Sequence, residues 1–286
     1  MDISVIVPIY KGNQYIPAIL DMIRRNVSFA QENGTRLEVE LLLVNDFPSE
    51  PIVLDPAVDP GYEIRIFENE RNEGIHASRV HGLSAASGSY ILFLDQDDEI
   101  TEDCLLSQYK AIQGHDVVIG NGLRGIKNQY RKIYRSKGKQ KLSCKEKYYI
   151  KAANQIVSPG HCLIRKEAIP NEWYEYIMTD NGGDDLFLWF LMFEGGKSFC
   201  TNDKCIYKHV ETGNNCSNDR NAMYRSSDNI IRISKECQVL PEKKLKQYKR
   251  RIAFLKKMQN GSALQKAIAC MKNLDICILK VYAFYK

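Results

Sequence analysis

Three carboxylates follow a strand-like apolar run in the stretch GSYILFLDQDDEI, residues 88–100. Asp95, Asp97 and Asp98 occupy three of four consecutive positions, so their like charges repel one another. A positive group is therefore expected to share this space. Carboxylate oxygens are the ligands that Mg²⁺ and Mn²⁺ prefer, so a divalent cation on this cluster is one answer.

A second pair of acids opens the apolar stretch NGGDDLFLWFLMFEGG, residues 181–196. Asp184 and Asp185 lie in the first turn of a predicted helix, where the helix dipole favours negative charge. A carboxylate at such a place can act as a general base. The alternative is an acid that only stabilises the start of the helix.

The elements that position these acids are predicted from apolar patterns. Short β-branched runs separated by two helical patterns indicate an α/β fold with a mostly parallel, doubly wound sheet. In such sheets ligands lie at the carboxyl ends of the strands. No phosphate loop of the form GxxxxGK[ST] or GxGxxG is found, so bound phosphates would need another partner, such as the cation. The four N-terminal strand candidates are ISVIVPIY (3–10), VELLLVND (39–46), YEIRIFEN (62–69) and SYILFLDQ (89–96).

The second half of the chain is less regular. DVVIGNGL (116–123) predicts a fifth strand, and residues 124–147 are expected to form a polar, mobile insertion. A short strand is expected within 198–217, and the tail from Pro241 onward is expected to be helical.

At this point the sequence resembles the inverting glycosyltransferases of family 2, which have the GT-A fold. The resemblance covers about residues 1–217 and rests on four motifs in the family's order. They are ISVIVPIYKGNQYI, LLLVND, NEGIHASRVHGLSAASGSYILFLDQDD and GGDDLFLWFL.

The resemblance implies a role for several acids. Asp185 would be the catalytic base, and Asp97 would ligate a Mn²⁺ or Mg²⁺ ion that bridges the donor's two phosphates. Asp95 would face the ribose or the metal, and His209 would complete the metal site or contact the diphosphate. The alternative for Asp97 and Asp98 is a cap on a helix that starts near Thr101.

Other residues are expected to bind substrate by the same resemblance. Asp46 would read the nucleotide base, although the turn Phe47-Pro48 after it departs from the family's pattern and leaves the base open. The remaining expected substrate contacts are Pro8 and Tyr10 beside the base, Arg79 facing the donor, Asp184, and His161 in the floor of the site.

The net charge of +5 hides an uneven distribution. Residues 124–151 carry +10 and residues 243–286 carry +11, which leaves −16 on the rest of the chain. An anionic membrane or a lipid-diphosphate acceptor would fit these two basic segments. In the tail, Leu245, Tyr248 and Ile252 recur at helical spacing. The alternative to a membrane contact is therefore a helix that packs this apolar stripe on the domain or on a dimer partner. No RNA-binding aromatic motif accompanies the charge, so nucleic acid is not expected.

The resemblance implies an inverting glycosyltransferase that acts in surface polysaccharide synthesis. A nucleotidyltransferase or an inactive nucleotide-sugar-binding module is the alternative. Nine cysteines without a CxxC pair and an N-terminus that enters a strand at once indicate a cytoplasmic protein, peripheral on the inner membrane face at most. The expected domains are a catalytic unit at 1–217, divided into 1–123 and 124–217 with the basic insertion 124–151, and a helical region at 218–286. The sugar, the acceptor, the linkage and the oligomeric state are left open.

Overall fold

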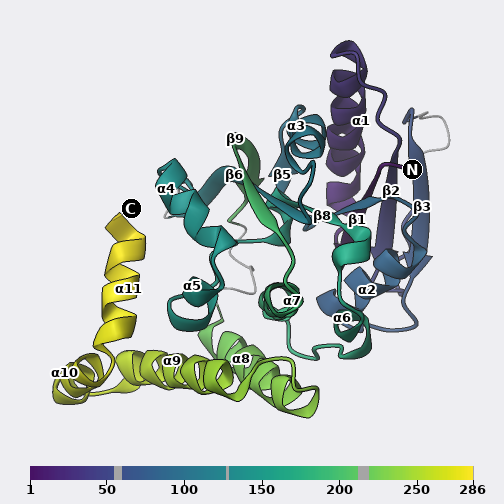
Figure 1. Ribbon diagram of the computed structural model, residues 1–286. Coiled ribbons are helices and arrows are strands. Elements are labelled where there is room, and N and C mark those ends of the chain that lie inside the picture. Colours follow the sequence, from purple (N-terminus) through teal and green to yellow (C-terminus); the bar gives the residue numbers. More distant parts are fainter. Residues whose placement is uncertain (55–59, 127–128, 212–218, 286) are drawn as a thin grey trace.

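The computed structural model describes residues 1–54, 60–126, 129–211 and 219–285 (Figure 1). Its N-terminal half contains four parallel strands in the order β3-β2-β1-β4, all within the predicted runs. β1, β2 and β4 are almost wholly buried, as their continuous apolar sequences require. The strands are β1 (Ile3–Ile9), β2 (Val39–Asn45), β3 (Glu63–Glu68) and β4 (Tyr90–Phe93).

Helices cover both faces of these strands, which confirms the doubly wound α/β prediction. Helix α1 (Ile16–Glu32) packs Ile19 and Ile23 against the side chains of Val5 and Val7, which share one face of β1. Helix α2 (Ile75–Ala85) lies on the other face, where Leu83 shares a core with Ile6. Alternate residues of one strand therefore hold two separate helices in place.

The C-terminal half extends the same sheet with mixed pairing. Beyond β4 the order is β8-β6-β9-β5, with β7 paired to β6. β8 is antiparallel to β4 and to β6, whereas β9 runs parallel to β6. The strand expected within 198–217 is longer than expected, because β9 covers 11 residues. These strands are β5 (Glu99–Ile100), β6 (Val117–Ile126), β7 (Gln129–Lys132), β8 (Cys162–Arg165) and β9 (Phe199–His209).

The prediction of a mobile insertion at 124–147 is wrong for the described residues. This segment forms β7, helix α4 (Lys137–Gln140), a 3₁₀ turn and the start of helix α5 (Glu146–Lys151). Tyr134 and Leu142 of this segment are buried, and so are Tyr148, Tyr149 and Ile150 directly after it. These side chains hold the segment against the rest of the protein.

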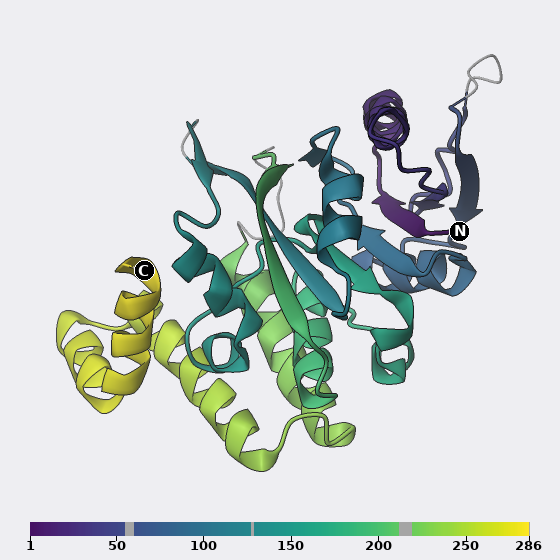
Figure 2. The same ribbon diagram turned by 45° about the horizontal axis from the view of Figure 1, so that its top comes forward.

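The C-terminal region is helical, as predicted. Figures 1 and 2 show α9 to α11 at the end of the molecule farthest from β3. Tyr248 of α9 packs against Phe190 of α7, with ring centroids 5.2 Å apart, so this helix packs on the domain. The division at 217/218 stays a prediction. The remaining helices are α3 (Cys104–Ala111), α6 (Asn171–Glu175), α7 (Asp184–Glu194), α8 (Arg220–Glu236), α9 (Glu242–Asn260), α10 (Ala263–Lys272) and α11 (Leu274–Tyr285).

Candidate active site

The carboxyl ends of β1 and β4 are joined by the side chain of Gln96, the residue between the first two acids of the cluster. Its Nε2 donates to the carbonyl oxygen of Tyr10 at 3.2 Å, and its Oε1 accepts from the Tyr10 N–H at 2.9 Å. Gly12 leaves room for this contact, because a Cβ there would lie 2.1 Å from Oε1 of Gln96. The acidic turn is thereby fixed against the end of β1.

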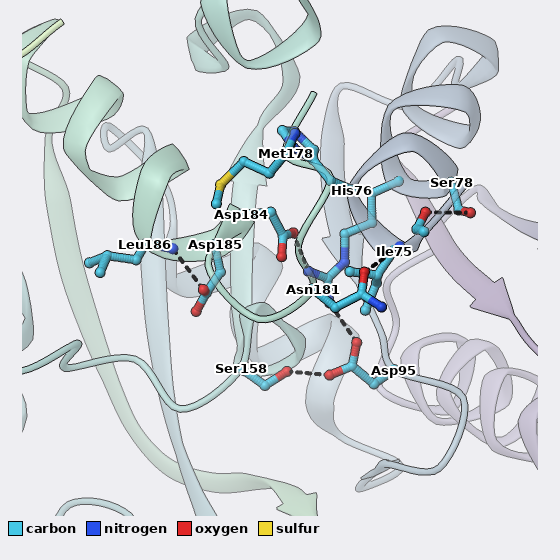
Figure 3. A network of polar contacts seen from close by, with 12 residues as sticks. Ile75, His76, Ser78, Asp95, Ser158, Met178, Asn181, Asp184, Asp185 and Leu186 are labelled. Carbon is cyan, nitrogen blue, oxygen red and sulfur yellow. Dashed lines mark hydrogen bonds and ion pairs between the residues drawn. The ribbon is translucent and has the colours of Figure 1, made fainter. Parts of the chain in front are cut away.

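The positive group expected beside the acidic cluster is Arg79 of α2. Its Nη2 lies 2.5 Å from Oδ1 of Asp95, and its Nη1 lies 2.5 Å from Oδ2 of Asp184. Ser158 donates a further hydrogen bond to Asp95, at 3.1 Å (Figure 3). One buried guanidinium therefore ties together the two acidic motifs. Contact of Arg79 with a donor stays a prediction.

Asp184 does not lie open to a substrate, contrary to expectation. Its side chain is buried behind the first turn of α7. Burial opposes its ionisation, but the Arg79 guanidinium outweighs this effect, and the pKa of Asp184 is lowered. Asp184 is therefore an ionised partner of Arg79, and its contact with substrate stays a prediction.

Asp185 has a different environment although it is the next residue. Its Oδ2 accepts from the side-chain amide of Asn154, and its Oδ1 accepts from the backbone N–H of Leu186, both at 2.7 Å (Figure 3 draws the second bond). Burial and the neighbouring Asp184 charge raise the pKa of Asp185 to about 7. A carboxylate with a pKa near neutrality suits a general base.

The loop before α7 is held against the start of α2. Asn181 accepts from the Ile75 N–H at 3.3 Å, and His76 accepts from the Met178 N–H through Nδ1 at 2.9 Å (Figure 3). Gly182 has a φ of 96°, which only glycine adopts readily. No local sequence pattern indicates the partners of His76, Asn154, Ser158 or Asn181, since each partner lies far along the chain.

The residues predicted to bind the base lie at the ends of β1 and β2. Asp46 is buried and accepts from Asn69 Nδ2 at 2.7 Å and from the Glu73 N–H at 2.7 Å, so it fixes the loop before α2. The Tyr10 ring is 42% exposed, with the Phe47 ring 5.5 Å away and edge-on. Pro8 pairs with Val44 inside the sheet. These contacts leave the exposed Tyr10 ring as the surface open to a planar ligand.

His161, which was expected to contact substrate, lies inside the fold, and that contact stays a prediction. Its side chain is fully buried, with Nδ1 2.9 Å from the Gly120 carbonyl oxygen and Nε2 accepting from the Val157 N–H at 3.3 Å. Burial lowers the pKa of His161 to about 4, so the ring is neutral. Its bond to Val157 orders the segment that carries Ser158.

Asp98 and His209 form a pair beside the acidic turn. Nδ1 of His209 lies 3.1 Å from Oδ1 of Asp98, which also accepts from the Val210 N–H and, through Oδ2, from the Tyr207 hydroxyl. Burial raises the pKa of Asp98 to about 6. A carboxylate on Nδ1 is the usual partner of a histidine that binds metal through Nε2.

The acidic turn does not cap the next helix, because α3 begins at Cys104, directly after Asp103. Within the described ranges no three acidic, histidine or cysteine side chains are grouped closely enough to hold a metal ion by themselves. A cation at the acidic turn would therefore have at most one or two protein ligands and would complete its shell with other oxygens, as Mg²⁺ commonly does, and its binding stays a prediction.

The sequence matches the family model described as glycosyl transferase family 2 over residues 4–172. Glycosyltransferase GlyG of Streptococcus pneumoniae serotype 4 is 29% identical over 123 residues, which cover 42% of this chain and 38% of that protein. The minor teichoic acid biosynthesis protein GgaB of Bacillus subtilis is 36% identical over 104 residues, 35% of this chain and 11% of that protein. The chain thus spans less than half the length of either relative.

Solved structures of S. aureus TarS residues 1–349 are similar in fold. The complex with UDP-GlcNAc has a TM-score of 0.63 and 17% identity, covering 96% of this chain and 81% of that chain. The complex with UDP has a TM-score of 0.56, covering 91% of this chain and 74% of that chain. At this level of identity the likeness establishes a shared mixed α/β fold.

Proposed function

Because the chain belongs to glycosyltransferase family 2, we propose that it transfers a sugar from a nucleoside-diphosphate donor to an acceptor hydroxyl with inversion at the anomeric carbon. Asp185 would take the proton of the acceptor hydroxyl as its oxygen attacks the anomeric carbon. The bond from that carbon to the diphosphate breaks, and the nucleoside diphosphate leaves.

The contrast between Asp184 and Asp185 carries the proposal. A single displacement needs one carboxylate that can accept a proton near neutral pH, and the pKa of Asp185 is raised to about 7. A double displacement needs a carboxylate free to attack the sugar. Asp184 is buried against Arg79, and Asp95 is paired with the same guanidinium, so neither suits that role. The arrangement favours inversion.

A uridine diphosphate sugar is the donor we propose to test first. The exposed Tyr10 ring, with the Lys11 ammonium 5.4 Å from its centroid, offers a face for a base and a charge for a phosphate. The fold shared with a protein solved with UDP-GlcNAc supports this choice.

A Mn²⁺ or Mg²⁺ ion is part of the proposal. Asp97 on the half-buried acidic turn and Nε2 of His209 would hold it, with Asp98 orienting the histidine. Such an ion, when bound, neutralises charge on the departing diphosphate. The relative GgaB, named for teichoic acid biosynthesis, supports an acceptor in cell-surface glycan synthesis.

The two basic segments suggest a further partner, an anionic membrane. Lys139 of the first segment donates a hydrogen bond to the carbonyl oxygen of Ala283 in the second. The segments therefore meet on one side of the molecule, and both would face the membrane by charge attraction.

The test is a screen of nucleotide sugars for donor hydrolysis and for transfer, with the anomeric configuration of the product read by NMR. Asp185→Asn should lose transfer but keep donor binding, whereas Asp180→Asn, a change of the same kind in the preceding loop, should keep both. Retained configuration would overturn the inverting mechanism. Release of pyrophosphate from a nucleoside triphosphate supplied with a sugar 1-phosphate, with no turnover of any nucleotide sugar, would identify a nucleotidyltransferase.

A further inference from the structure

Helices α10 and α11 expose large apolar side chains at the end of the molecule. Leu264 and Met271 of α10 are 71% and 66% exposed, and Ile278 of α11 is 65% exposed. Leu274 and Val281 are also more than half exposed. Isolated exposed apolar residues are common on proteins, but a group of this size marks a contact surface.

These side chains form one face on each helix. Leu264, Ile268 and Met271 recur at spacings of four and three residues on α10, and Leu274, Ile278 and Val281 do so on α11. The opposite side of α11 is used by the protein itself, since Ile276 and Ala283 are buried there. Helix α11 is thus apolar on both sides, although only one side packs inward.

Basic residues lie at the same end of the molecule as this face. The inner side of α11 packs on the first basic segment, where Ala283 shares a small apolar cluster with Leu142 and Tyr148. Figures 1 and 2 show α4, α5 and α11 at the same end of the molecule. Lys272 is exposed between Met271 and Leu274, at the junction of the two helices.

The charge identifies the occupant of this face. Residues 263–285 of the two helices carry Lys266, Lys272 and Lys280 against Asp275, a net +2, so a second copy would bring like charges against each other, which disfavours association. An anionic lipid surface complements the charge and accepts the apolar side chains into its acyl boundary.

We propose that the exposed face of α10 and α11 inserts into the interfacial region of an anionic membrane. The inference rests on the membrane contact proposed above and is independent of the transfer reaction. It differs from charge attraction alone, because burial of apolar side chains is not screened by salt. Membrane binding should therefore have a part that persists at high salt.

Co-sedimentation with vesicles tests the insertion. The protein should bind vesicles of phosphatidylcholine mixed with phosphatidylglycerol, and part of this binding should remain at about 1 M salt, where the Debye length is about 3 Å. The variant Leu274→Glu/Ile278→Glu should lose at least about tenfold in vesicle affinity at low and at high salt, since burial of even one such side chain is worth about that factor.

Two matched variants separate the contributions. Val53→Glu introduces one glutamate in place of an apolar residue that is 81% exposed in the other half of the chain, so it should bind like the unchanged protein. Lys272→Gln should weaken binding at low salt only. Thermal melting of each variant checks that the fold is retained, as expected for exposed positions.

Three results would overturn the insertion. The first is equal vesicle binding by the double variant and by the Val53→Glu control. The second is complete loss of binding of the unchanged protein at high salt. The third is that the unchanged protein is a dimer in light scattering, that the double variant is a monomer, and that neither binds vesicles. That result would assign the face to a second copy of the chain. Donor hydrolysis without vesicles reports on the transfer site separately.

Discussion

The side-chain amide of Asn154 donates a hydrogen bond to the carboxylate of Asp185, with 2.7 Å between Nδ2 and Oδ2. Oδ1 of the same amide accepts from the Ile156 N–H at 3.2 Å, which fixes its orientation. Asn154 follows the basic segment closely, so that segment helps to position the proposed base. A donor to the ionised carboxylate favours ionisation and limits the rise in pKa.

The first prediction concerns the pH dependence of transfer. Asp185 must be ionised to accept a proton, and its raised pKa of about 7 leaves it protonated in mild acid. The value of kcat/KM should therefore rise with pH and level off above about pH 7. In the Asp185→Asn variant, the rate of transfer should fall by a factor of about 10²–10⁴, and its dependence on pH should disappear. If the variant kept the same acid limb, another group would be responsible for it.

The second prediction uses Asn154→Ala. Loss of the amide donor removes an interaction that lowers the pKa of Asp185, so the acid limb of the profile should move to higher pH. Activity well above the limb should fall much less than in Asp185→Asn. Gln155→Ala, at the next residue, is the control and should leave the limb in place. An unshifted limb with reduced activity at every pH would mean that Asn154 supports only the local structure.

The sequence predicted the parts of this site that local patterns encode. Apolar runs located β1, β2 and β4, and the acids that follow them or open α7 were found with them. The role of Arg79 was not predictable in this way, because its partner Asp184 lies 105 residues away. The burial of His161 was not predictable for a related reason, since a histidine beside a turn gives no sign of it. The high count of lysines and arginines likewise gave no indication that tyrosines of the basic segment are buried.

The third prediction is that Arg79 is required for stability. Arg79→Ala would leave the buried carboxylate of Asp184 and that of Asp95 unpaired, which should lower the free energy of unfolding by about 3–5 kcal/mol. Arg79→Lys should recover only part of this lost free energy of unfolding, because one ammonium cannot span both acids as the guanidinium does. Urea denaturation measures both. Arg232→Ala, which breaks an exposed pair with Glu236, should cost about 0.5 kcal/mol or less.

The pH dependence of that loss gives a second check. The pKa of Asp184 is held below its ordinary value of 3.8, so its pairing stabilises the fold fully above that value and is lost as pH falls through the lowered pKa. In Arg79→Ala the unpaired acid can take up a proton instead. The difference from the unchanged protein should thus be largest near neutral pH and shrink in acid. An equal difference at every pH would point to lost packing alone.

The last prediction concerns the acidic turn and the cation. Asp97→Ala and His209→Ala should each remove most of the Mn²⁺ dependence of UDP binding in calorimetry, because each deletes a proposed ligand. Asp98→Asn should have a smaller effect of about 10–100-fold in metal affinity, since Asp98 acts on the metal only through His209. Glu102→Ala, at an exposed acid just past the turn, should change neither affinity. If Asp97→Ala kept both nucleotide affinity and the response to Mn²⁺, the acidic turn would not be the metal site.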